Sequence, residues 1–105
     1  MLVLVKYFFK AQTVLAILLI SSSVNSADLL NGKTLHQAKC YQCHAEKSGL
    51  GNGDVIYTRL DRKAKDLAGV KRMISMCNTE LRLDLFPEDE VDLLAYINQQ
   101  FYKYQ

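Results

Sequence analysis

The stretch CYQCH, residues 40 to 44, places two thiols and an imidazole within five positions of the chain. The only other cysteine is Cys77, so the three thiols cannot all pair with one another. A framework of several disulfides is therefore excluded. Which chemistry uses these thiols depends first on the compartment in which the chain folds.

The N-terminus has the layout of a secretory signal peptide. Lys6 and Lys10 are its only charged residues, an apolar run follows over 11–20, and small and polar residues follow over 21–27. An uncleaved membrane anchor is the alternative, but the two lysines leave an apolar piece shorter than the roughly 20 residues that a spanning helix needs. A cleaved signal is favoured.

Val24 and Ser26 suit the third and first positions before a cleavage site, so we predict cleavage after Ser26. The sequence then divides into a signal peptide over 1–26 and one mature domain over 27–105. We expect a periplasmic or otherwise exported protein that keeps no membrane span after cleavage.

The mature chain has no net charge to attract nucleic acid. Lys6 and Lys10 leave with the signal, so eleven of the thirteen basic residues remain against eleven acidic ones. Nucleic-acid binding therefore has no support from composition. A mature chain of this length forms a small domain whose apolar core needs a supplement, which CYQCH is placed to provide.

Cys-x-x-Cys-His is the signature of covalent attachment of one haem c. Two thiols at this spacing can add to the two vinyl groups of a porphyrin while the adjacent imidazole binds the iron. Cys40 and Cys43 would form the thioethers, and His44 would be the proximal iron ligand. Export favours this interpretation, because c-type attachment takes place outside the bacterial cytoplasm.

A redox dithiol and a zinc site are two other uses of these cysteines. A thioredoxin-like dithiol needs a strand-helix-strand framework, and no alternating strand pattern is visible. A zinc site would need a further ligand from His36 or Cys77, and the paired spacing of zinc modules is missing. We expect His36 on the outside of its helix and Cys77 as a small buried thiol.

Helical signals cover most of the mature chain. Residues 28–39 lead into the motif as an N-terminal helix, with Gly32 where a second helix can approach closely. Residues 66–76 carry apolar side chains at helical spacing, and a helix begins at Pro87, followed by three acidic residues. The sequence predicts an all-α domain.

This arrangement resembles the class I cytochrome c family, on the stretches LNGKTLHQAKCYQCH and EVDLLAYINQQ. The resemblance covers essentially the whole mature chain. It implies a small cytochrome c fold with three to four helices around one covalently attached haem. It also implies that Gly32 and Tyr96 lie near the crossing of the terminal helices.

The second iron ligand is expected to be a methionine, because a neutral thioether keeps the reduced state accessible. Met73 and Met76 are the candidates. The stretch RMISMCNTELRLDLFPEDEVDLLAYI is similar to the C-terminal part of the sphaeroides haem protein type of small cytochromes. That resemblance puts Met76 at the distal-ligand position and Leu85 opposite Cys77, where the family has a disulfide partner.

The sequence thus predicts an electron carrier rather than an enzyme, with His44 and Met76 on the iron. Tyr57 and Arg59 are the expected contacts of the haem propionates. Single electrons would pass between redox partner proteins. A gas-binding haem protein for oxygen, nitric oxide or carbon monoxide, in which Met76 dissociates, is the alternative, and a haem subunit held in a larger complex is a third interpretation.

Overall fold

The computed structural model describes residues 26–105, so the predicted signal peptide falls almost wholly outside the described residues. The elements in order are α2 (Leu29–Lys39), α3 (Tyr41–Ser48), α4 (Val55–Thr58), α5 (Leu67–Leu81), α6 (Pro87–Ile97) and the π-helical segment η2 (Asn98–Tyr102). No strand occurs between residues 26 and 105, so the all-α prediction is confirmed for this part of the chain. The five α-helices between residues 26 and 105 exceed the three to four expected, because α3 and α4 are too short for periodicity to reveal.

The helix ends follow local chemistry. The Asp28 carboxylate accepts from the Asn31 N–H at 3.0 Å and caps α2, and Asp66 accepts from the Gly69 N–H at 2.7 Å and caps α5. These side chains satisfy N–H groups that have no partner inside the helix. Pro87 begins α6 as predicted.

Helices α2 and α6 cross at a position without a side chain. A Cβ on Gly32 would overlap the Asp92 carbonyl oxygen and come within 2.8 Å of Tyr96 Cβ. Asn31 adds hydrogen bonds from its amide to Asp89 at 3.1 Å and Asp92 at 2.8 Å. The expected close approach at Gly32 is confirmed, and Tyr96 lies beside it.

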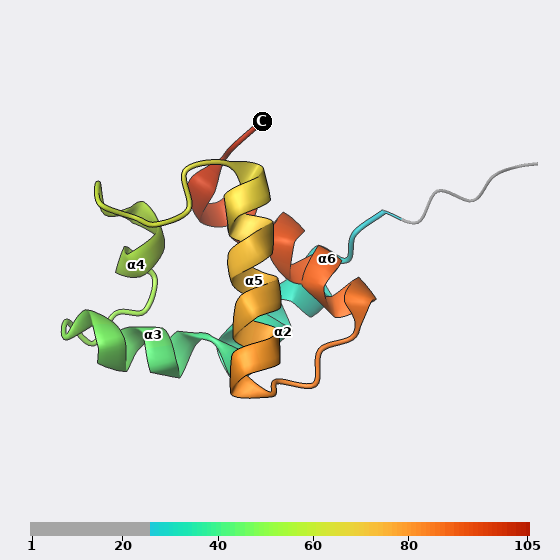
Figure 1. Cartoon of the computed structure of the whole chain (residues 1–105), viewed down its shortest axis with the longest axis horizontal. Coiled ribbons are helices and arrows are strands. Elements are labelled where there is room, and N and C mark those ends of the chain that lie inside the picture. Colours follow the sequence, from blue (N-terminus) through green and yellow to red (C-terminus); the bar gives the residue numbers. More distant parts are fainter. Residues whose placement is uncertain (1–25) are drawn as a thin grey trace, which may run out of the picture.

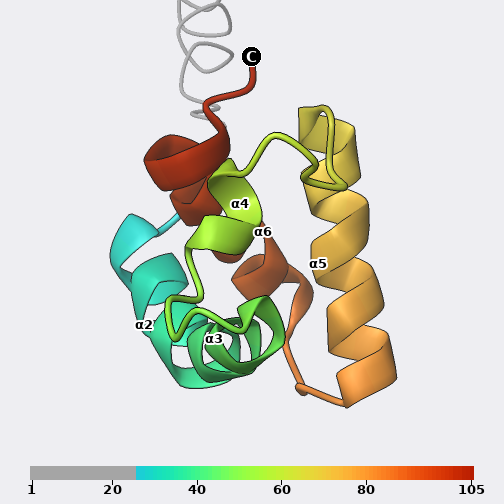
Figure 2. The ribbon, with the colours of Figure 1, turned by 90° about the vertical axis from the view of Figure 1, so that its left-hand side faces the viewer.

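Helix α5 stands apart from the short helices that follow the motif. It packs mainly against α6, and Figure 1 shows it between α6 on one side and α3 and α4 on the other. The view turned by 90° places α5 alongside the group formed by α2, α3 and α4 (Figure 2). Helix α5 extends five residues beyond its predicted end at Met76, and Arg82 closes it in the left-handed conformation, with φ 50°.

A small core joins these elements. Its fully buried members are Tyr57, Ala64, Val70, Leu93 and Ile97. They come from α4, the α4–α5 connection, α5 and α6, so the core lies where these segments meet. Within residues 26–105, no helix is both long enough and apolar enough to cross a membrane.

Candidate functional site

A cavity of about 320 Å³ lies among α3, α4, α5 and α6. Its volume falls within the range of roughly 300–1,000 Å³ that is usual for small-molecule sites. Most of its wall is apolar, with side chains that include Ile56, Met73, Ile74, Leu93 and Ile97. Such a wall suits a large apolar ligand.

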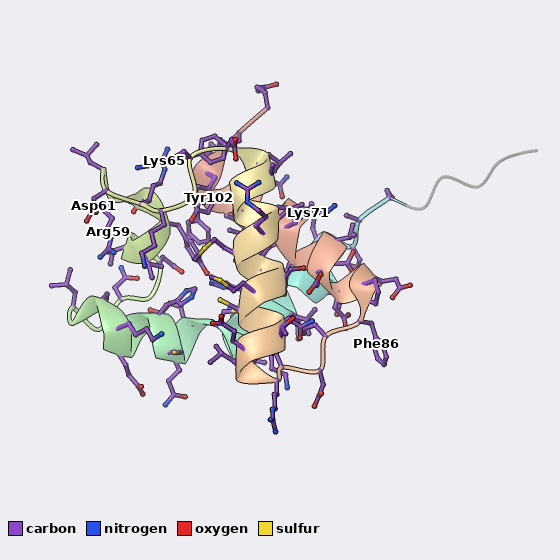
Figure 3. All side chains as sticks on the ribbon, viewed as in Figure 1. Arg59, Asp61, Lys65, Lys71, Phe86 and Tyr102 are labelled. Atoms are coloured by element: carbon purple, nitrogen blue, oxygen red, sulfur yellow. The ribbon has the colours of Figure 1, made fainter. Side chains whose placement is uncertain are left out.

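The polar part of the wall is cationic. Lys47, Arg59 and Lys63 line the cavity, and no carboxylate does so among the described residues. Arg59 also pairs with Asp61 at 3.1 Å, and both side chains lie beside α4 in Figure 3. The cavity therefore combines an apolar wall with positive charge, which favours an amphipathic anion. Lys47 was not among the residues predicted for the site, although its position three residues after His44 on one helix was a usable signal.

Cys40 and His44 both line this cavity. Cys40 joins α2 to α3, and its carbonyl accepts from the His44 N–H at 3.1 Å, so one helical turn sets their spacing. Burial, with smaller contributions from Cys77 and Cys43, raises the pKa of Cys40 to about 11. Cys40 is therefore a thiol at neutral pH.

His44 presents a partly buried imidazole. Its Nδ1 atom is buried and has no hydrogen-bond partner in the part of the chain described. Burial, followed by the nearby His36 and Lys47, lowers the pKa of His44 below its ordinary value. A neutral imidazole with an unpartnered nitrogen is the form that binds a metal ion.

The loop over residues 49–54, which contains three glycines, joins α3 to α4 and passes directly over α3. A Cβ on Gly53 would come within 2.5 Å of the Tyr41 carbonyl oxygen and 3.1 Å of His44 Cβ. Only a residue without a side chain fits this approach without movement. Gly53 thus helps to cover His44.

The other two cysteines differ in their surroundings. Cys77, on α5, lines the cavity, whereas Cys43 faces a shallow polar depression with Lys39, Gln42 and Glu46. Cys43 nevertheless contributes to the raised pKa of both Cys40 and Cys77, so the three thiols lie near one another. The sequence predicts a small buried thiol at Cys77, whereas the residue is only half-buried.

The two candidate methionines have different positions. Met73 lines the cavity and packs against the core. Met76 is 44% exposed and is not among the residues of the cavity wall. Val70, Met73, Ile74 and Cys77 form one face of α5, at spacings that the sequence already contains.

Tyr57 lies in the cavity wall, but its hydroxyl is engaged elsewhere. The hydroxyl is 3.1 Å from His36 Nε2, and burial raises the pKa of Tyr57 above its ordinary range. His36 is only 3% exposed, so the expectation that it lies on the outside of α2 is wrong. Aromatic side chains from α4, α6 and η2 surround it, a long-range packing that the pattern of α2 cannot reveal.

These residues fit a covalently held haem. An apolar wall, a cationic rim, the Cys40 thiol and the His44 imidazole meet at one cavity. Between residues 26 and 105, no three His, Cys, Asp or Glu side chains converge in the way that a metal ion held by protein side chains alone requires. Haem iron needs fewer protein ligands, because the porphyrin supplies the others.

Comparisons with protein-family models, with curated proteins and with solved structures found no match to this chain. Its function is therefore argued from its own residues.

Proposed function

We propose that this protein is an exported monohaem c-type cytochrome that transfers single electrons between redox partner proteins. The observation that carries the proposal is the cavity in which Cys40 and His44 of the CYQCH motif meet an apolar wall and three cations. The crossing of α2 and α6 at Gly32 supports a small cytochrome c fold around it. The bound haem c would supply a one-electron iron couple.

The motif residues have separate roles. Cys40 and Cys43 would hold the porphyrin through thioether bonds, and His44 would bind the iron on one side. Cys43 does not line the cavity, so its attachment requires a local movement of its side chain or of α3. The thioethers would fix the ligand to the chain permanently.

Met73 is the stronger candidate for the second iron ligand. It lies in the cavity wall on α5, whereas Met76 is largely outside it. A shift of Met76 into the cavity would require α5 to turn and would expose part of the face that carries Val70. A thioether is a soft, neutral ligand that raises the reduction potential.

The cations would hold the propionate groups. Lys47, Arg59 and Lys63 provide charge for two carboxylates. Arg59 would thus contact a propionate, as expected from the sequence, while it also pairs with Asp61. Tyr57 would pack against the porphyrin through its ring, since its hydroxyl is bonded to His36.

The first experiment tests whether haem is covalently attached to the chain. The mature protein, produced with a c-type maturation system, is denatured and extracted with acidic acetone, and its mass and absorption spectrum are recorded. A mass increase equal to one haem, with colour retained by the polypeptide, is expected. A colourless chain of unmodified mass would refute the proposal.

A pair of matched variants tests the ligand. Met73→Ala should change the reduced iron from low to high spin, while Met76→Ala should leave the spectrum low-spin. The opposite result would assign Met76 as the iron ligand, as the resemblance to the small cytochromes implies. Rapid stoichiometric binding of carbon monoxide to the reduced wild-type protein would favour the gas-binding alternative.

A further inference from the structure

Tyr57 forms a buried hydrogen bond with a base. Its hydroxyl is 3.1 Å from His36 Nε2, and the two residues are 6% and 3% exposed. No other acceptor lies within hydrogen-bond distance of this hydroxyl in the described part of the chain. Burial lowers the pKa of His36 below its ordinary value, so the ring is neutral at pH 7 and Nε2 can accept the phenol proton.

A carboxylate lies where positive charge on His36 would be stabilised. Asp54 Oδ1 is 3.9 Å from His36 Nε2. The Asp54 side chain is 39% exposed as a whole, yet its Oδ1 atom is buried and has no hydrogen-bond partner within residues 26–105. A proton that arrives at Nε2 therefore meets an unpartnered negative oxygen.

A row of aromatic rings connects Tyr57 with the C-terminal end of the chain. Tyr57 meets Tyr102 edge to face, with ring centroids 5.7 Å apart, and Tyr102 stacks on Tyr104 at 5.3 Å. Figure 3 places Tyr102 next to α5, on the side that faces α4. At the other end of the row, the Tyr57 ring is 5.1 Å from that of His44.

The three tyrosines differ in what can take their protons. The Tyr104 hydroxyl donates to the Ala64 carbonyl at 2.9 Å and accepts from Arg62 Nε at 3.0 Å. A carbonyl is a poor base, and the Arg62 guanidinium lies 5.7 Å and 5.5 Å from the ring centroids of Tyr102 and Tyr104. Positive charge on these rings is thus only transient, and the oxidation comes to rest on Tyr57, which has a nitrogen base.

We propose that Tyr57 is a redox-active tyrosine, with His36 as its proton acceptor and with Tyr102 and Tyr104 as its electron route to the protein surface. A one-electron oxidant takes one electron from Tyr57 through this route. The O–H bond breaks, the proton moves to His36 Nε2, and the products are a neutral tyrosyl radical and an imidazolium facing Asp54. The rings give electrons a defined path between the cavity and the protein surface. Whether a haem in the cavity uses this path rests on the proposed function.

The test generates the oxidant outside the protein. The mature protein is illuminated with ruthenium tris-bipyridine and persulfate, which together form a one-electron oxidant, and is frozen for electron paramagnetic resonance. The wild type should give the signal of a hydrogen-bonded tyrosyl radical. Tyr57→Phe should lose this signal while it keeps the ring that stacks on Phe101. Tyr41→Phe is the matched control, because Tyr41 lies near His36 without bonding to it and should keep the signal.

Two further variants test the partners. His36→Gln keeps a hydrogen-bond acceptor without a base and should lose the Tyr57 signal, and Tyr102→Phe should lower its yield by interrupting the route. Circular dichroism checks that each variant folds. An unchanged signal in Tyr57→Phe would overturn the proposal, as would an unchanged yield in both His36→Gln and Tyr102→Phe. Because the oxidant is external, the result does not depend on haem, whose absence would be detected separately by mass.

Discussion

Replacing Gly32 with alanine should separate the two helices on which the cavity depends. The new methyl group would overlap the Asp92 carbonyl oxygen and lie 2.8 Å from Tyr96 Cβ, so the backbones must move apart. Overpacking of this kind costs about 1–3 kcal/mol, and more where backbone atoms are involved. The better helix propensity of alanine returns about 1 kcal/mol. Because the clash is with backbone atoms, the cost lies at the upper end of that range, so we expect a net loss of about 2 kcal/mol, which corresponds to a fall in Tm of roughly 10 °C in a domain of this size.

Thermal unfolding followed by circular dichroism measures this loss. Gln37→Ala is the control, because Gln37 is exposed on the same helix and gains helix propensity without a clash. Cys40 follows directly after α2, so the shift should also lower the yield of the proposed covalent attachment of haem. A Gly32→Ala protein as stable as wild type would refute the close crossing of α2 and α6.

Other predictions concern the core, a helix end and pH. Leu93→Ala should lose about 2–5 kcal/mol of unfolding free energy, measured by chemical denaturation, because Leu93 is only 1% exposed. Val91→Ala is the control, because Val91 is 53% exposed on the same helix. Its loss should be less than about 0.5 kcal/mol. Asp66→Ala should cost about 1 kcal/mol by removing the cap of α5, and an unchanged denaturation midpoint would contradict the capping role. Burial lowers the pKa of His36 below 6.5, so the unfolded chain binds the proton more readily and stability should fall as pH drops below that value. In measurements of Tm against pH, His36→Gln should reduce this loss of stability. Part of the loss should remain, since the lowered pKa of His44 also destabilises the folded chain at low pH.

Local sequence signals were sufficient for the main helices. Pro87 with three acidic residues after it predicted the start of α6, and Gly32 predicted the place on α2 where another helix approaches, while the resemblance to a family implied that this helix is α6. Both signals act through neighbouring backbone atoms or through the absence of a side chain, so they can be recognised without knowledge of the whole fold.

The details of the cavity depend on contacts between distant residues. His36 is polar and isolated on α2, and only the packing of Tyr57 and Phe101 around it makes it a buried residue. The position of Met73 in the cavity wall could be recognised from the sequence, since Met73 shares a helical face with Val70. The choice of Met76 came instead from the resemblance to a family, which assigns a position along the chain and not a direction in space.

The π-helical turn at Asn98–Tyr102 sets the direction in which the C-terminal side chains point. Such a turn holds one residue more than an ordinary helical turn. If the same residues wound as an ordinary α-helix, everything that follows would be rotated by about a quarter of a circle. Tyr102 would then leave the cavity wall without any change in its own identity. The width of the turn after Ile97 therefore decides, together with the aromatic residues themselves, which side chains reach the cavity.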